Sequence, residues 1–245
     1  MKQNKYDEPD FFDAYGRMDR SVKGLIGAGE WHVLQGMLPE LQGRSVLDLG
    51  CGYGWHCLYA RDQGASDIIG IDISEKMLEK AASLAEGTNI EYRRLPIEDI
   101  SFPSGRFDVV MSSLAFHYVA DFAAICAKVY ECLKPGGTFL FSVEHPVFTA
   151  REEQSWVYGD DGEPLYWPLD NYQSEGRRVT SFLTDNVVKY HRTMTTYINS
   201  VIGAGFTLQA IAEPEPAPDK LDLPGMRDEL RRPMFFIVSA TKSGR

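Results

Sequence analysis

Three glycines spaced two residues apart stand between a short apolar run and a segment that can form a helix. They are Gly50, Gly52 and Gly54 in the run Val46-Leu47-Asp48-Leu49-Gly50-Cys51-Gly52-Tyr53-Gly54. Glycines let a backbone turn sharply and approach a ligand closely. The free N–H groups of a following helix N-terminus can bind a carboxylate or a phosphate. The run therefore predicts a ligand-binding loop.

Two acidic residues accompany this loop. Asp72 ends the next apolar run, 18 positions after Gly54, and a carboxylate there can accept both hydroxyls of a ribose. Asp48 lies at the end of the first run, where it suits a ligand with an ammonium group and repels a diphosphate. The dinucleotide fingerprint G-x-G-x-x-G would need glycine at position 55, but Trp55 stands there and its indole would crowd a pyrophosphate.

Two histidines follow predicted strands. His117 lies in Leu114-Ala115-Phe116-His117-Tyr118 after the fourth strand, and His145 lies in Glu144-His145-Pro146 after the fifth. Ligands of open parallel sheets bind beyond the carboxyl ends of the strands. Histidine has the right unperturbed pKa for a base near neutral pH. We predict His117 as a base or orienter for an acceptor and His145 as a second catalytic candidate, with simple packing as the alternative for both.

Strands and helices must alternate to position these residues. Strands are expected at residues 45–50, 68–72, 90–93, 107–112 and 138–143, with helices at about 53–63, from Ser74 through Ala82, and from Asp121 to Leu133. A helix over 190–203 and strands over 206–212 and 234–241 follow. Such alternation predicts an α/β fold with a doubly wound, mostly parallel sheet.

Two segments fall outside this alternation. Residues 7–40 predict two helices with a break at Gly24, Gly27 and Gly29. Residues 145–188 are rich in aromatic residues: Phe148, Trp156, Tyr158, Tyr166, Trp167 and Tyr172. These aromatics can enclose an apolar or cationic acceptor beneath a lid, although a small hydrophobic core is the commoner use of such residues.

At this point a family resemblance is visible. The run VLDLGCGYG resembles the first motif of class I S-adenosylmethionine-dependent methyltransferases, and Phe107–Val110 resembles their fourth-strand motif. Leu133–Gly137, LKPGG, resembles the turn before their fifth strand, so the resemblance runs from about Ser45 to Ser142. It implies a Rossmann-like seven-stranded sheet with an antiparallel last strand, and a subgroup like the methyltransferases of ubiquinone and menaquinone biosynthesis.

The resemblance also implies a cofactor site for S-adenosyl-L-methionine and its product S-adenosyl-L-homocysteine. The glycines would lie under the methionine end, Asp48 would help to hold its amino group, Asp72 would bind the ribose and Ile73 would flank the adenine. Pro96 stands where relatives usually carry the aspartate for the adenine amine, so Glu98 or the backbone of Ile97 takes its place. The full predicted set is Asp48, Gly50, Cys51, Gly52, Gly54, Asp72, Ile73, Met77, Ile97, Glu98, Ser113 and Leu114.

Composition limits the other possibilities. The chain has 245 residues, of which 44% are hydrophobic, which fits one large α/β domain. A net charge of −10 argues against nucleic acid as a partner, because phosphate binding uses a basic face. No window approaches the roughly 18 apolar residues of a membrane span, and the amino terminus lacks a signal sequence. Cys51, Cys57, Cys126 and Cys132 match no metal-binding spacing, which predicts no metal and reduced thiols in a cytoplasmic protein.

We therefore expect one methyltransferase domain over 1–245, with a helical cap (1–44), a cofactor-binding core (45–144), a lid (145–188) and the rest of the sheet (189–245). The expected reaction is in-line methyl transfer to a small molecule, at oxygen, nitrogen or carbon, without nucleic acid or membrane partners; a homodimer is left open. A nicotinamide-dependent oxidoreductase and a non-catalytic S-adenosylmethionine-binding protein are the alternatives. A nucleic-acid methyltransferase is disfavoured, because Ser112–Ala115 replaces its Asn/Asp-Pro-Pro-aromatic motif.

Overall fold

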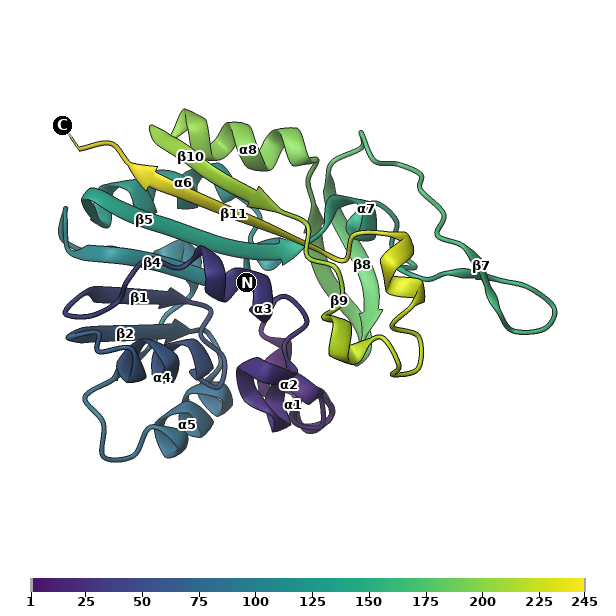
Figure 1. The fold of residues 1–245 in the computed structure, drawn as a ribbon, viewed down its shortest axis with the longest axis horizontal. Helices are drawn as coiled ribbons and strands as arrows, with labels where there is room; N and C mark the ends of the chain where they lie inside the picture. Colours follow the sequence, from purple (N-terminus) through teal and green to yellow (C-terminus); the bar gives the residue numbers. More distant parts are fainter. Residues whose placement is uncertain (1, 245) are drawn as a thin grey trace.

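The computed structural model describes residues 2–244, and its centre is a seven-stranded sheet (Figure 1). The strands are β1 (Ser45–Leu49), β2 (Asp67–Asp72), β3 (Glu91–Arg94), β4 (Phe107–Ser113), β5 (Leu133–Glu144), β10 (Phe206–Ala212) and β11 (Phe235–Lys242). Their order is β10-β11-β5-β4-β1-β2-β3. Strand β11 pairs antiparallel with both β5 and β10, and the other strand pairs of this sheet are parallel. The predicted Rossmann-like α/β fold with an antiparallel last strand is confirmed.

Helices pack on both faces of this sheet. The α-helices are α1 (Pro9–Gly16), α2 (Asp19–Val22), α3 (Trp31–Leu34), α4 (Trp55–Asp62), α5 (Glu75–Leu84), α6 (Phe122–Cys132), α7 (Pro146–Thr149) and α8 (Met194–Gly203). Short 3-10 turns lie at Lys5–Asp7, Gly24–Gly27, Gln35–Met37, Ile97–Asp99, Phe116–Tyr118, Pro218–Lys220 and Asp228–Arg231. Ser74 accepts a hydrogen bond from the backbone N–H of Met77 at 3.1 Å and caps α5 as predicted.

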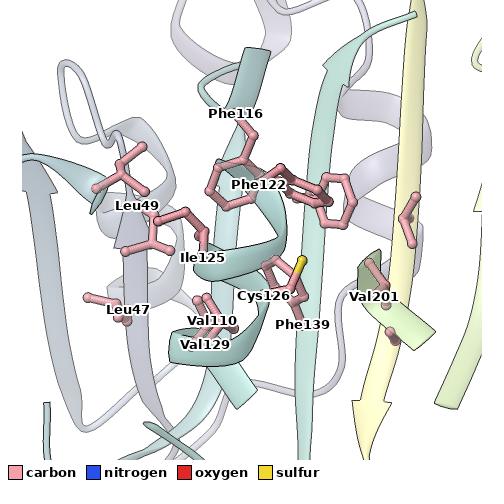
Figure 2. Close-up of a cluster of buried hydrophobic side chains, with 14 of the residues drawn as sticks. Leu47, Leu49, Val110, Phe116, Phe122, Ile125, Cys126, Val129, Phe139 and Val201 are labelled. Atoms are coloured by element: carbon pink, nitrogen blue, oxygen red, sulfur yellow. The ribbon is translucent and has the colours of Figure 1, made fainter. Parts of the chain in front are cut away.

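Alternate side chains of β1 point to opposite layers. Leu47 and Leu49 pack with Phe122 and Val129 of α6 in the larger hydrophobic core (Figure 2). Val46 packs in a second core with Cys57 of α4. Because side chains alternate along a strand, Asp48 shares the side of Val46, which places its carboxylate beneath α4.

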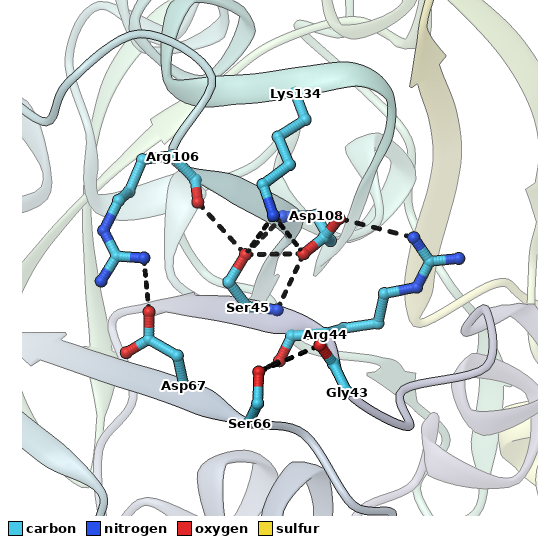
Figure 3. Close-up of polar contacts among 8 residues, drawn as sticks. All are labelled: Gly43, Arg44, Ser45, Ser66, Asp67, Arg106, Asp108 and Lys134. Atoms are coloured by element: carbon cyan, nitrogen blue, oxygen red, sulfur yellow. Dashed lines mark hydrogen bonds and ion pairs between the residues drawn. The ribbon is translucent and has the colours of Figure 1, made fainter.

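A polar network ties the amino ends of the strands together (Figure 3). Asp108 Oδ2 accepts hydrogen bonds from the Ser45 backbone N–H at 2.9 Å and from the Ser45 hydroxyl at 2.7 Å. Lys134 Nζ lies 2.7 Å from the same oxygen. Burial would raise the pKa of Asp108, but these donors hold it well below its ordinary value. Ligands bind at the opposite, carboxyl end of the strands, so this network positions β1, β4 and the turn before β5.

Two predicted elements were wrong in extent. Residues 190–203 do not form one helix: Tyr190 and His191 belong to strand β9 (Thr184–His191), and α8 begins only at Met194. The long-range pairing of β9 with β8 (Gly176–Phe182) outweighs the local helical pattern. Residues 7–40 form three short helices and 3-10 turns rather than two helices.

The segment after β5 forms several small pieces. It contains α7, a hairpin of β6 (Val157–Tyr158) and β7 (Pro164–Tyr166), and the start of the β8–β9 pair. The hairpin projects away from the sheet, at the right of Figure 1. Across residues 2–244, no helix has the length and apolar character needed to cross a membrane.

Candidate functional site

A cavity of about 310 Å³ lies where β1, β2, β4 and β5 end. The amino-terminal segment contributes Lys2, Gln3, Lys5, Tyr6, Tyr15, Met18 and Arg20 to its wall; the sheet edge and its loops contribute Gly50, Gly52, Asp72, Ile73, Met77, Pro96, Ile97, Glu98, Ser113, Leu114, Ala115, His117, Tyr118, Val119 and Glu144; and Phe148, Phe182, Met234 and Phe235 come from later in the chain. The cavity therefore joins the predicted cofactor loop to the predicted catalytic region.

The structure brings most of the predicted site residues to this wall. Gly50, Gly52, Asp72, Ile73, Met77, Ile97, Glu98, Ser113, Leu114 and His117 line the cavity, whereas Asp48, Cys51, Gly54 and His145 do not. Pro96, flagged as a departure from the family pattern, lies on the wall beside Ile97 and Glu98. A contact to the adenine amine from either neighbour stays a prediction.

Gly52 and Gly54 are needed in the loop for different structural reasons. Gly52 has a φ of +54°, and a Cβ atom added there would meet nothing within 4 Å. A Cβ on Gly54, at a φ of +74°, would run into the Tyr92 hydroxyl. Gly54 is thus required by packing and by its left-handed backbone, while Gly52 keeps open the space in which a ligand can approach the backbone. This open cradle fits the expected cofactor.

The Asp72 carboxylate connects the loop to α5. Its Oδ2 accepts the Gly52 backbone N–H at 2.9 Å, and its Oδ1 accepts the Ser74 backbone N–H at 2.9 Å. Burial raises the pKa of Asp72 above its ordinary value, although these two hydrogen bonds oppose the shift. A carboxylate has about four acceptor positions, so each oxygen can still accept one ribose hydroxyl.

Asp48 lies below the loop rather than on the cavity wall. It is 1% exposed, and its Oδ2 accepts a hydrogen bond from Cys57 Sγ at 3.5 Å. Its Oδ1 has no hydrogen-bond partner among the described residues. Burial without a neighbouring cation raises the pKa of Asp48 to about 7. An unpaired buried oxygen of this kind suits an ammonium group or a bridging water molecule.

Arg20 of α2 is a cavity residue to which the sequence analysis assigned no ligand. Its Nη2 lies 3.2 Å from Glu30 Oε1 and 3.3 Å from Ser113 Oγ at the end of β4. The Ser113 hydroxyl also donates to Glu30 at 2.8 Å. Burial would lower the pKa of Arg20, but buried Glu30 outweighs it and raises the pKa above its ordinary value. Arg20 is thus always protonated, and on the cavity wall its charge is paired with that of Glu30. No local pattern signals it, because Ser113 is 93 positions away.

His117 lies on the cavity wall, and its hydrogen bond to the backbone indicates which ring nitrogen carries the proton. It is 2% exposed. The backbone N–H of Glu144 donates to its Nδ1 at 3.4 Å, so the proton of the neutral ring is on Nε2. Burial lowers the pKa of His117 to about 4. At neutral pH the ring is therefore uncharged and offers Nε2–H as a hydrogen-bond donor.

Glu144 and Lys189 form a buried ion pair that sequence reasoning missed. Lys189 Nζ lies 2.6 Å from Glu144 Oε1 and is fully buried. Burial would raise the pKa of Glu144, but Lys189 holds it below its ordinary value. Glu144 lines the cavity and Lys189 does not. The two residues belong to β5 and β9, so their pairing depends on the docking of β9 beside the sheet.

Aromatic rings form part of the cavity wall. Tyr6 lies edge-on to Tyr15 at 5.3 Å between ring centroids, and its hydroxyl lies 3.4 Å from that of Tyr118. Phe148 and Phe182 come from the predicted lid segment. The amino-terminal segment is attached at both ends of this region: Gln3 exchanges hydrogen bonds with the Val188 backbone, and Asp7 accepts from Ser74 and from the Lys76 backbone N–H.

His145 has other partners. Its Nδ1 accepts the backbone N–H of Val147 at 3.0 Å and caps α7. Its Nε2 lies 2.7 Å from Glu213 Oε1. With both ring nitrogens engaged away from the cavity, the geometry gives His145 a capping role rather than contact with an acceptor.

Known proteins resemble this chain over the core and over its whole length. Residues 47–141 match the methyltransferase domain family. A methyltransferase structure from Listeria monocytogenes is 51% identical, covering 90% of this chain and 99% of that one, with a TM-score of 0.85. An S-adenosylmethionine-dependent methyltransferase from Mesorhizobium loti is 43% identical over 89% and 100% of the two chains, with a TM-score of 0.84. Malonyl-[acyl-carrier protein] O-methyltransferase from Erwinia billingiae is 36% identical over 81% of this chain and 77% of that protein.

Proposed function

This chain belongs to the class I S-adenosylmethionine-dependent methyltransferases, and from that membership we propose that it methylates a small-molecule acceptor in the cavity described above. The observation that carries the proposal is the continuity of one cavity from Gly52 and Asp72 to His117 and Glu144. Group transfer requires the donor and the acceptor to share one enclosed space.

We assign the cofactor end to the residues that fit its chemistry. The open space at Gly52 would receive the methionine end, and Arg20 would pair with its carboxylate. Asp72 would accept the ribose hydroxyls through the lone pairs that Gly52 and Ser74 leave free. The orphan oxygen of Asp48 is compatible with an amino group above it.

The protein contributes mainly alignment. S-Adenosyl-L-methionine supplies a methyl group on a positively charged sulfur, which an acceptor lone pair displaces in line. The aromatic wall of Tyr6, Tyr118 and Phe182 would hold an acceptor and exclude water. His117 would orient the acceptor through Nε2–H, because its low pKa makes it a weak base. Positioning of this kind contributes roughly 7–11 kcal/mol in favourable cases.

Two segments would have to move for ligands to enter. Residues 145–188 supply Phe148 and Phe182 to the wall, and residues 2–8 cross it between Val188 and Ser74. Hydrogen bonds of Gln3 and Asp7 hold the second segment, and Tyr6 packs edge-on against Tyr15 and Tyr118, so opening must break these contacts. We propose both as lids, with hydrogen exchange slowed by ligand in these segments more than in β1 and β4.

Calorimetry with S-adenosyl-L-homocysteine tests the assignment directly. The wild-type chain should bind it at one site, and Asp72→Ala should bind about 10–100-fold more weakly, because charge-assisted hydrogen bonds contribute roughly 1.5–3 kcal/mol. Asp62→Ala removes an exposed carboxylate far from the cavity and serves as the control. Unchanged affinity in Asp72→Ala would remove Asp72 from the site, and no binding by the wild type would refute the proposed function.

A further inference from the structure

The cavity wall beside His117 contains the carboxylate of Glu144, of which one oxygen is hydrogen-bonded. Glu144 Oε1 is bound by Lys189 Nζ at 2.6 Å. Glu144 Oε2 is buried and forms no hydrogen bond among the described residues, although the Gln154 amide, whose Nε2 is also unpaired, lies close enough to help lower the pKa of Glu144. Most buried polar atoms are paired in folded proteins, and an unpaired oxygen on a cavity-lining residue is a candidate partner for a ligand or a water molecule.

Lys189 fixes the charge of Glu144 but is itself out of reach. Besides Glu144, its ammonium group donates to Gln154 Oε1 at 3.1 Å and lies 4.8 Å from the centroid of the Phe182 ring. It is fully buried and contributes nothing to the cavity wall. A ligand in the cavity therefore meets the negative charge of Glu144 and not the positive charge of Lys189.

A donor lies next to this acceptor. The backbone N–H of Glu144 occupies Nδ1 of His117, which leaves Nε2–H for a ligand. Around the two groups the wall is largely aromatic, with Tyr6, Phe148 and Phe182. An aromatic enclosure with one anionic acceptor and one neutral donor selects by hydrogen bonding and by charge.

We infer, on the basis of the proposed methyl transfer, that Glu144 is the specificity-determining residue for an acceptor that presents an N–H or O–H group. The acceptor donates this hydrogen to the Glu144 carboxylate while its lone pair forms the new bond to the methyl carbon. The bond between sulfur and carbon breaks with its electron pair left on sulfur, and the acceptor proton passes to solvent. A carboxylate or phosphate acceptor would meet an ionised Glu144 and is rejected.

Three probes that share a phenyl ring test this inference: phenethylamine, 4-ethylphenol and 3-phenylpropionate. Each is titrated calorimetrically into protein saturated with S-adenosyl-L-homocysteine. The amine or the phenol should bind at least tenfold more tightly than the carboxylate, and the difference between these two arms separates N–H from O–H acceptors. Equal or tighter binding of 3-phenylpropionate, or no binding of any probe, would overturn the inference.

Variants connect the preference to Glu144. In Glu144→Gln an amide replaces the anion, and the preference should fall below threefold. Glu229→Gln is the matched control, because Glu229 is also a largely buried carboxylate with one oxygen paired, at 3.0 Å to Arg232, and one oxygen unpaired. It lies off the cavity wall and should keep the preference. An unchanged preference in Glu144→Gln would refute the role of Glu144.

Two further measurements keep the outcomes distinct. If Glu144→Gln does not fold, the double variant Glu144→Gln, Lys189→Met removes both charges and gives the same readout. Failure of the wild type to bind S-adenosyl-L-homocysteine would refute the proposed function itself. Normal binding of S-adenosyl-L-homocysteine by wild type and variants, with no preference for N–H or O–H probes, would refute only this inference.

Discussion

Removal of Lys189 tests the buried ion pair on which the acceptor end depends. In Lys189→Met the side chain keeps its length but leaves Glu144, which is 12% exposed, without its cation. Breaking a buried pair by removing one partner costs roughly 3–5 kcal/mol. For a chain of this length that corresponds to a melting temperature lower by roughly 6–20 °C.

The loss of stability in Lys189→Met should be larger at neutral pH than at acidic pH. In the wild type, Lys189 outweighs burial and holds the pKa of Glu144 below its ordinary value. The stabilisation by this ion pair is therefore present above the pKa of glutamate in the unfolded chain, about 4.3. It is lost as the pH falls through the lower pKa that Glu144 has in the folded chain. In Lys189→Met only burial acts strongly, and the pKa of Glu144 rises. The variant should therefore lose most stability at neutral pH and approach the wild type near pH 4.

Urea unfolding at pH 7.5 and pH 5 measures both effects. Lys23→Met is the control, because Lys23 and its partner Asp19 are each 59% exposed and such pairs contribute about 0–1 kcal/mol. The double variant Lys189→Met, Glu144→Gln should recover part of the loss, since no charge is left buried. A loss in Lys189→Met as small as that of the control, at both pH values, would refute the buried pair as a source of stability.

Three further outcomes are expected. Gly52→Val should abolish binding of S-adenosyl-L-homocysteine in calorimetry, because its side chain would fill the open space at a backbone φ of +54° that valine rarely adopts; retained affinity in a chain shown to be folded by circular dichroism would contradict the cradle. His117→Ala should lower turnover far more than cofactor affinity, whereas His117→Asn keeps a donor and should retain more turnover; equal losses would argue against the role of Nε2–H as donor. Asp48 has a folded pKa of about 7, so its own contribution to stability should fall as pH rises from about 4 to about 7; in thermal melts Asp48→Asn should therefore gain stability relative to the wild type across that range, and a constant difference would contradict the raised pKa.

Local sequence signals were enough for the core of the fold. The strand at 206–212 was predicted with the bounds that β10 has, and Ser74 was predicted as the cap of α5. Both depend on neighbours within a few residues, through side-chain periodicity and a hydrogen bond to the helix N-terminus. The helix expected at 190–203 begins only at Met194 for the opposite reason: partners in β8 convert Tyr190 and His191 into strand.

In the candidate site, too, residues placed by neighbouring elements could be located from sequence, whereas side-chain directions could not. The glycines and Asp72 could be located from sequence because one strand–turn–helix unit and the next strand place them, and the backbone of parallel strands brings those ends together. The direction of Asp48 depends on which face of β1 it occupies, and the structure turns it beneath α4, towards Cys57. Both histidines follow strands, yet only His117 reaches the cavity wall.

The sequence by itself determined a nucleoside-cofactor loop on a doubly wound sheet, because those features follow from short-range backbone geometry. Tertiary structure alone decided which groups complete the cavity: Arg20 meets Ser113 across 93 positions, Lys189 meets Glu144 across 45, and Gln3 meets Val188 across 185. Pairing over such separations is set by how whole elements dock. Charge and hydrogen-bond complementarity at the acceptor end is therefore a property of the assembled fold.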